Sequence, residues 1–110
     1  AVRDLGLALR ADPLHAEAHL TLCAARLIEE RPDLALPACT QAVSLSARGG
    51  KRQLRLLHGD ALLTRAEALK RLGRFREAAE DARRALSSAP ADWPGRGRAL
   101  RMKEELAYVK

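Results

Sequence analysis

Residues 72–86 read LGRFREAAEDARRAL, and this stretch is the most informative part of the chain for the fold. Its small and apolar side chains recur every three or four residues, at Ala78, Ala82, Ala85 and Leu86. That spacing places them on one side of a helix. Gly73 precedes the pattern and Pro90 follows it. Because glycine commonly ends a helix and proline cannot continue one, we predict a helix over residues 75–88 that follows a glycine turn.

The same pattern occurs twice more along the chain, which indicates an internal repeat. It stands 43 residues earlier at Ala35, Cys39, Ala42 and Val43, and a further 34 residues earlier at Ala1, Leu5, Ala8 and Leu9. The preceding segments agree, since Ala18, Leu20, Thr21 and Cys23 correspond to Ala61, Leu63, Thr64 and Ala66. The step of 43 residues is nine residues longer than the step of 34. We therefore expect an insertion at residues 50–58, built as two extra helical turns.

Periodicity and helix breakers together predict about six helices. Their expected ranges are 1–13, 14–30, 32–47, 51–72, 75–88 and 96–109. Pro37 should lie in or near the first turn of its helix, because deeper inside it would remove a backbone hydrogen bond. Gly59 should weaken its helix by about 1 kcal/mol relative to alanine.

Composition supports an all-α fold in a single domain. The 110 residues include 22 alanines and 20 leucines, and aromatic residues make up only 3%. Alanine and leucine are the strongest intrinsic helix formers. No apolar run approaches the roughly 20 residues that a membrane span needs. Two cysteines are too few for a disulfide scaffold and match no zinc spacing, so we expect free, buried thiols and an intracellular location, cytoplasmic or nuclear.

The net charge of +6 is concentrated in the second half of the chain. Residues 1–50 carry 5 Lys/Arg against 6 Asp/Glu, whereas residues 51–110 carry 15 against 8. A basic run straddles a predicted helix–turn–helix corner, at Lys70, Arg71, Arg74, Arg76, Arg83 and Arg84. Such a field attracts acidic protein segments or the phosphates of a nucleic acid. A solvated helical surface rich in arginine is the favoured interpretation of this charge, ahead of either ligand.

The helical pairs resemble the tetratricopeptide repeat, whose pattern places small residues where two helices approach and a proline at the end. Residues 59–92 fit best, with Leu62, Arg65, Ala66 and Leu69 in the first helix and Ala78, Ala82, Ala85 and Pro90 in the second. Residues 16–49 are more divergent, because Ala47 replaces the proline. Residues 1–13 look like an isolated second helix, and residues 95–110 like a first helix or cap. The resemblance implies a right-handed solenoid of helical hairpins.

The resemblance also implies a concave face lined by the first helices, where members of this family hold peptides. Carried onto this sequence, the face comprises Leu20, Thr21, Ala24, Leu27, Leu63, Thr64, Glu67, Lys70, Arg71, Arg98 and Arg101. One subclass grips the C-terminal carboxylates of chaperones through lysine, asparagine and arginine. Of the matching positions here, only Arg98 fits, and the chain contains no asparagine. We therefore expect no binding of chaperone tails.

No residue pattern indicates catalysis, a metal or a cofactor. His15, His19 and Cys23 follow one side of a helix, but His19 and Cys23 occupy positions that the repeat uses for packing. Glu29-Glu30 and Glu104-Glu105 are adjacent in sequence, so their side chains diverge on a helix and cannot act as an acid–base pair. No glycine-rich phosphate loop with a following lysine is present. An enzyme is not expected.

The sequence therefore predicts a non-catalytic scaffold or adaptor that binds a protein or peptide, with an acidic segment as the favoured partner. Nucleic-acid binding through the basic half is the alternative, and a purely structural spacer is the third. Terminal repeats normally need polar caps. The half-repeats at both ends thus predict self-association through uncovered apolar flanks. Whatever the partner, the chain reads as part of a longer repeat protein.

Overall fold

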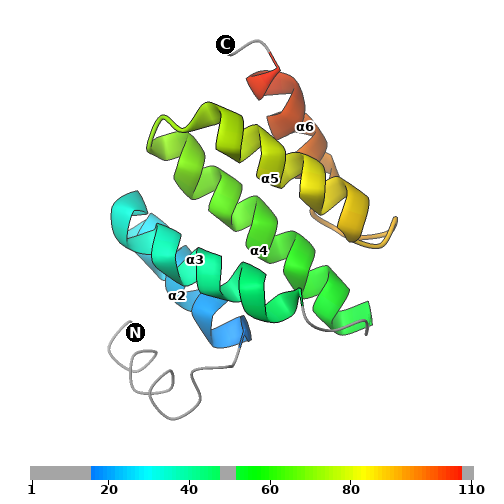
Figure 1. The fold of residues 1–110 in the computed structure, drawn as a ribbon, viewed down its shortest axis with the longest axis horizontal. Coiled ribbons are helices and arrows are strands. Elements are labelled where there is room, and N and C mark those ends of the chain that lie inside the picture. The colour runs from blue at the N-terminus through cyan, green and yellow to red at the C-terminus, as the bar shows by residue number, and fades with distance from the viewer. Residues whose placement is uncertain (1–15, 48–51, 108–110) are drawn as a thin grey trace.

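Five helices joined by short turns account for most of residues 16–47 and 52–107, the part of the chain that the computed structural model describes. They are α2 (Ala16–Ile28), α3 (Pro32–Ser46), α4 (Arg52–Arg71), α5 (Phe75–Ser88) and α6 (Arg96–Leu106), as Figure 1 shows. These residues include no strand, which confirms the all-α class. The helix predicted at residues 1–13 lies outside the described residues.

The helices form consecutive antiparallel pairs. Helix α2 packs against α3, and α4 against α5, while α3 also lies along α4 and α6 along α5 (Figure 1). Of residues 50–58, predicted as a helical insertion, 52–58 form the first two turns of α4, and residues 50 and 51 lie outside the described ranges. Because α4 is longer than α2, its N-terminal turns extend beyond the first pair of helices. The segment that follows α5 packs against these turns.

The turn between α4 and α5 has the geometry that glycine favours. Gly73 has φ 79, in the left-handed region. Its N–H donates to the carbonyl of Lys70 at 3.0 Å, and the N–H of Arg74 donates to that of Leu69 at 2.9 Å. These two bonds satisfy carbonyls that the end of a helix would otherwise leave unpaired.

The turn between α2 and α3 repeats this geometry 43 residues earlier. Glu30 stands in the place of the glycine, with φ 61. Its N–H donates to the carbonyl of Leu27 at 3.0 Å, and the N–H of Arg31 donates to that of Arg26 at 2.9 Å. The two pairs are therefore the same structural unit, although a glutamate has replaced the glycine in the first.

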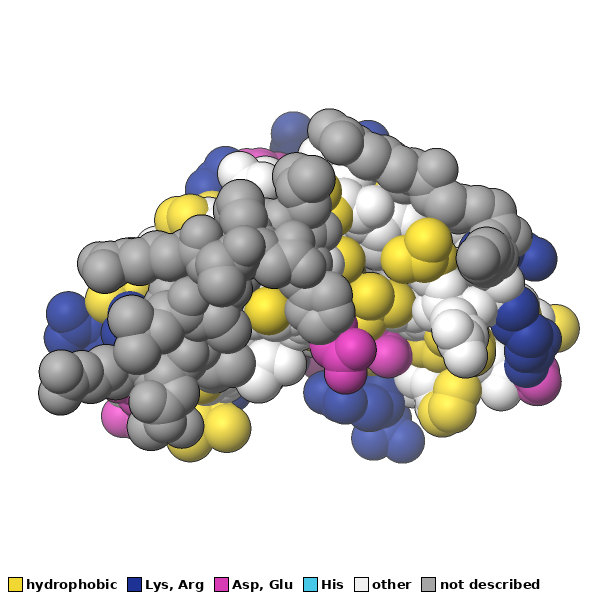
Figure 2. Space-filling model, turned by 90° about the horizontal axis from the view of Figure 1, so that it is seen from below, with side chains coloured by type: hydrophobic (Ala, Val, Ile, Leu, Met, Phe, Trp, Pro, Cys, Tyr) yellow, Lys and Arg dark blue, Asp and Glu magenta, His cyan; other side chains and the backbone are white. Residues whose placement is uncertain are grey.

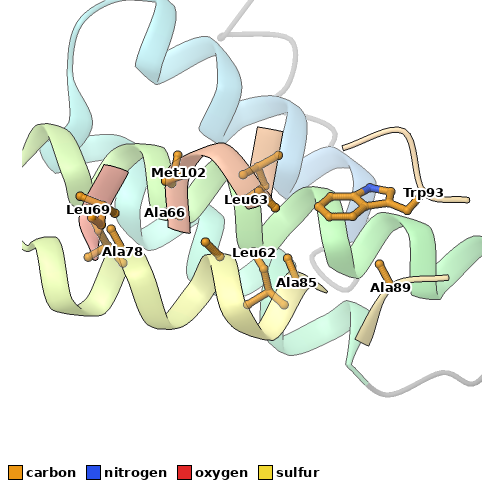
Figure 3. Close-up of a cluster of buried hydrophobic side chains, with 12 residues drawn as sticks. Leu62, Leu63, Ala66, Leu69, Ala78, Ala85, Ala89, Trp93 and Met102 are labelled. Atoms are coloured by element: carbon orange, nitrogen blue, oxygen red, sulfur yellow. The ribbon is translucent and has the colours of Figure 1, made fainter. Parts of the chain in front are cut away.

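The larger core lies between α4, α5 and α6 and contains the only tryptophan (Figure 3). Ala66, Ala78 and Ala82 are fully buried, so their small side chains allow the helix backbones to approach closely. Trp93 is 3% exposed, whereas Phe75 is 36% exposed. The tryptophan therefore belongs to this core, whereas the phenylalanine side chain is accessible to solvent.

A smaller core lies between α2, α3 and α4, and it contains a disulfide. Cys23 and Cys39 are fully buried and are bonded to each other, with their Cα atoms 5.2 Å apart. That separation is ordinary for a disulfide. The prediction of free thiols was wrong, because Cys23 on α2 and Cys39 on α3 face each other at a separation that a disulfide bridges. The expectation of a reducing compartment loses the support it drew from unpaired cysteines.

Pro37 lies in the second turn of α3, next to the first turn, in or near which it was predicted. It has no N–H, so the helix lacks the hydrogen bond that this residue would normally donate. Its ring is exposed, and the helix continues to Ser46. In the ranges that the structure describes, no helix combines the length and the apolar character needed to cross a bilayer.

Candidate functional site

A cleft of about 480 Å³ opens between α2, α4 and the start of α6. Its walls come from three separate stretches of the chain. The lining residues are Leu20, Thr21, Ala24, Asp60, Leu63, Thr64, Pro94, Gly95 and Arg98. Because each of the three segments supplies three of them, the cleft exists only when the two pairs and α6 are packed together.

The inner surface of the cleft is mainly apolar. Leu63 is 4% exposed and belongs to the larger core, so it forms part of the floor. Leu20 and Ala24 are half-buried on α2. The hydroxyl of Thr21 donates to the backbone carbonyl of Glu17 at 2.9 Å, and the hydroxyl of Thr64 donates to the backbone carbonyl of Asp60 at 2.7 Å. Both hydroxyl hydrogens are therefore occupied within their own helices.

One wall of the cleft is set by Trp93, which is inserted against α4. Its indole Nε1 donates to Asp60 Oδ1 at 2.8 Å. A Cβ atom on Gly59 would lie 2.9 Å from Trp93 Cε2 and 2.9 Å from Ala89 Cβ, and a Cβ on Gly95 would also overlap the ring. The ring thus occupies a slot between two glycines, and this explains the glycine inside α4. Anchored in this way, the linker presents Pro94 and Gly95 to the cleft.

An ion pair holds the same linker from outside. The guanidinium of Arg52, at the start of α4, donates a hydrogen bond to the carboxylate of Asp92, and this charged contact is a salt bridge. The hydrogen bond from Arg52 lowers the pKa of Asp92. Both side chains are largely exposed, so the pair adds little stability, but it keeps the linker close to the beginning of α4.

Two charged side chains border the cleft. Asp60 accepts the tryptophan N–H described above, while Arg98 is exposed on α6 and forms no ion pair with any described residue. Arg98 is therefore available to a carboxylate on a bound molecule. The cleft combines an apolar trough with a single unpaired cation.

Six of the eleven residues predicted for the concave face line this cleft, namely Leu20, Thr21, Ala24, Leu63, Thr64 and Arg98. The other five do not. Leu27 is buried in the smaller core, and its carbonyl accepts a hydrogen bond from Arg71 at 2.9 Å. Arg71 also pairs with Glu67 at 3.3 Å, and Lys70 pairs with Glu105 at 3.2 Å. Arg101 is exposed on α6, away from the cleft lining.

Asp60, Pro94 and Gly95 line the cleft but were missed from the sequence. Asp60 is adjacent to the predicted face, and no local signal marks it. The linker residues depend on the insertion of Trp93, and the pairing of this ring with Gly59 spans 34 positions of the chain. A glycine within a helix, together with a lone tryptophan one repeat later, is the signal that could have found them.

A histidine–serine pair at a smaller hollow does not have the geometry of a catalytic dyad. Ser46 Oγ lies 2.9 Å from His58 Nδ1 and donates its proton to the carbonyl of Ala42 at 2.6 Å. The serine must therefore accept from the histidine, so it is not activated as a nucleophile. Burial, together with the nearby Arg65, lowers the pKa of His58. Within the two described ranges, no group of three or more His, Cys, Asp and Glu side chains is placed to hold a metal, and His15 lies outside those ranges.

The basic run at the α4–α5 corner is largely neutralised. Arg74 forms a bidentate pair with Glu77, at 2.8 and 2.7 Å. Arg83 and Arg84 both pair with Glu80. As described above, Lys70 and Arg71 also have acidic partners. Only Arg76 of the six predicted cations lacks an ion pair among the described residues. The corner is therefore a network of ion pairs more than a positive field.

Comparison with known families identifies one repeat. Residues 59–92 match the family model described as tetratricopeptide repeat. This match supports the resemblance noted in the sequence, and the matched residues include α5 and most of α4. No curated protein and no solved structure matches the chain.

Proposed function

We propose that this chain is a non-catalytic protein-interaction module whose cleft between α2, α4 and α6 holds a segment of a partner protein. The tetratricopeptide repeat at residues 59–92 supports the general role, because repeats of this family mediate contacts between proteins. The observation that carries the specific proposal is the three-walled apolar cleft of about 480 Å³ with Arg98 at its border. A pocket of this kind binds apolar groups and uses a few polar groups for orientation.

The chemistry of the cleft defines the kind of segment that fits it. Leu20, Ala24 and Leu63 offer a surface for an aliphatic or aromatic side chain. The guanidinium of Arg98 suits a carboxylate close to that side chain, since arginine binds carboxylates through paired hydrogen bonds. We therefore propose a partner segment with one buried apolar residue and a nearby Asp or Glu.

A chaperone C-terminal tail does not fit this cleft. The positions that would grip its carboxylates hold Leu20, Ala24, Thr64 and Pro94, and all four line the cleft without offering a cation. One arginine cannot replace a set of four or five polar contacts. Titration calorimetry with a peptide that ends in EEVD should give no measurable heat, and micromolar binding would contradict this part of the proposal.

The proposal is tested by site-specific photo-crosslinking. A photoreactive phenylalanine analogue at Thr21 should capture the partner, whereas the same analogue at Gln41, on the exposed side of α3, should not. The double variant Ala24→Arg/Arg98→Glu should abolish capture, because it fills the trough and reverses the charge. Arg101→Glu on the same helix is the matched control and should retain it.

Two other outcomes would replace the proposal. If the cleft variant captures the same proteins as the unaltered chain, the cleft is not the binding surface, and a spacer role is favoured. Salt-dependent binding of an oligonucleotide, lost on Arg76→Glu, would favour a nucleic-acid interface. The ion pairs at the α4–α5 corner speak against that second outcome, because they already occupy most of its cations.

A further inference from the structure

The exposed large apolar residues are concentrated at one edge of the molecule. Five such residues occur in the described ranges, and four of them flank the α2–α3 and α4–α5 turns: Ile28, Leu34, Leu72 and Phe75. Ile28 is 83% exposed. We call this surface the turn edge and define it as residues 26–34 and 67–77. Clustered apolar groups on a protein surface mark sites of interaction, whereas scattered ones do not.

The two halves of the turn edge are neighbours in space. Arg71, the last residue of α4, donates to the carbonyl of Leu27 near the end of α2 at 2.9 Å. Figure 1 shows both turns at the left of the molecule. Figure 2, seen from below with the same end at the left, shows hydrophobic, basic and acidic side chains around the rim of that end. A single partner surface can therefore contact both turns.

The two halves carry opposite charge. Residues 26–34 contain two arginines and three acidic residues, a sum of −1, while residues 67–77 contain four basic and two acidic residues, a sum of +2. Glu30 and Asp33 in the first half, and Arg76 in the second, form no ion pair with any described residue. Arg31 of the first half also forms no ion pair with a described residue, so the unpaired charges sum to −1 in the first half and +1 in the second, beside exposed apolar side chains.

We propose that the turn edge is a self-complementary interface through which two copies of this chain associate about a two-fold axis. In a two-fold pair, a surface on one copy meets its own counterpart in the reverse order. The acidic first half of each copy then faces the basic second half of the other. Ile28 and Leu34 meet the partner's Leu72 and Phe75. An unrelated partner would need no such alternation of charge, so the pattern favours a second copy.

The proposed pair is independent of the cleft and differs from the self-association predicted from the sequence. None of the residues that line the cleft belongs to the turn edge. Each copy of the pair therefore keeps its cleft open. The sequence placed self-association at the uncovered flanks of the terminal helices, whereas the structure places the apolar cluster at the turns.

Sedimentation velocity at increasing concentrations tests the proposal. The unaltered chain should shift from monomer to dimer. Ile28→Ser and Phe75→Ser should each weaken dimerisation roughly tenfold or more, as expected for an apolar residue at the centre of an interface. Leu100→Ser is the matched control, because Leu100 is 40% exposed on α6 outside the edge, and it should leave the dimer unchanged. Circular dichroism should show the same helix content for all four proteins.

Charge reversal tests the two-fold geometry itself. Glu30→Lys alone and Arg76→Glu alone should each be monomeric, because each places like charges across both contacts. An equimolar mixture of these two variants should dimerise, since every contact in the mixed pair then joins opposite charges. A chain that stays monomeric at every concentration would overturn the proposal. So would a dimer that Leu100→Ser disrupts, or singly reversed variants that dimerise as the unaltered chain does.

Discussion

The pairs α2–α3 and α4–α5 share one backbone design but are held together by different chemistry. Positions 43 residues apart correspond throughout, including the turn hydrogen bonds. Where the first pair joins Cys23 to Cys39 by a disulfide, the second places Ala66 and Ala82. The backbone requires only small side chains at these two positions, and each pair satisfies that requirement in its own way.

At another pair of corresponding positions, the second pair of helices has charged side chains where the first has apolar ones. Arg65 and Asp81 form a bidentate ion pair in the second pair, at 2.6 and 2.8 Å, with side chains 15% and 4% exposed. The equivalent residues of the first pair are Leu22 and Ala38, which lie in its apolar cluster. The first pair therefore combines a covalent bond with an apolar contact, and the second combines an apolar contact with a buried charge pair.

The largest effect should come from breaking the buried ion pair on one side only. Arg65→Leu leaves the Asp81 carboxylate buried without its cation, and this should lower the free energy of unfolding by about 3–5 kcal/mol. The double variant Arg65→Leu/Asp81→Ala copies the first pair and should regain most of the loss. Urea denaturation followed by circular dichroism measures both. If the single variant loses less than the double variant, the buried charge is not the dominant cost.

Removing the disulfide should have the next largest effect. Cys23→Ala/Cys39→Ala gives the first pair the alanines of the second, and the stability should fall by about 3 kcal/mol, as expected for a closed loop of this length. The fold should remain, because alanines already serve at the corresponding positions. Reduction of the unaltered chain should have a comparable effect in the same denaturation experiment.

The reverse exchange sharpens the comparison. If the two pairs have the same backbone, Ala66→Cys/Ala82→Cys should form a second disulfide on oxidation. Thiol titration of the denatured protein should then find no free thiol groups. Two free thiols per chain would show that the helices of the second pair do not approach each other in the same way as those of the first.

The third effect concerns Gly59, which corresponds to Ala16 in the first pair. Alanine normally stabilises a helix relative to glycine by about 1 kcal/mol. Here the added Cβ would lie 2.9 Å from both Ala89 Cβ and Trp93 Cε2, so Gly59→Ala should cost about 1–3 kcal/mol through overpacking. Tryptophan fluorescence should also report displacement of the ring.

Gly97→Ala in α6 is the control for Gly59. A Cβ atom at Gly97 would meet nothing within 4 Å, so this variant should be neutral or more stable. If both alanine variants gained stability, the slot for Trp93 would not be as tight as the structure indicates.

The helices could be predicted from the sequence because their determinants are local. The helix over residues 75–88 is observed with the predicted bounds, because Gly73 and Pro90 stand just outside the two ends of a regular helical pattern of apolar residues. Six of the nine residues that line the cleft were on the predicted face, and those on α2 and α4 could be placed there because Leu20 and Leu63 occupy equivalent places in two helices.

The features that were missed depend on contacts between distant residues. The disulfide spans 16 positions and follows no recognised spacing, although both cysteines correspond to alanines at close helix contacts. Trp93 is buried because of Gly59, one repeat away. Lys70 and Arg71 were assigned to the groove, but their partners Glu105 and Leu27 lie on other helices. Such pairings come from tertiary packing and leave no local periodicity.

The fourth prediction concerns the two turns. Glu30 has φ 61 where the second pair has Gly73, and a side chain in the left-handed region costs roughly 1 kcal/mol or more. Glu30→Gly should therefore raise the stability by about 0.5–1 kcal/mol, part of the gain being offset by the greater flexibility of glycine in the unfolded chain. Gly73→Ala should lower it by a similar amount. Opposite signs for these two variants are required if the turns are equivalent.

The smallest effect should come from His58, which joins α4 to α3 at the junction between the two pairs. Burial is the main cause of its lowered pKa, and Arg65 acts in the same direction, while the Val43 carbonyl and Asp81 act against it. Because the folded pKa lies below the unfolded value of about 6.5, the unfolded chain binds the proton first as the pH falls. The free energy of unfolding should therefore decrease as the pH drops below about 6.5, and it should level off once the pH is below the folded pKa of His58. His58→Gln retains a donor for Ser46 but does not titrate, so its stability should vary less over this window in parallel denaturation series. An identical pH dependence in both proteins would assign the effect to groups within the pairs instead of the junction between them.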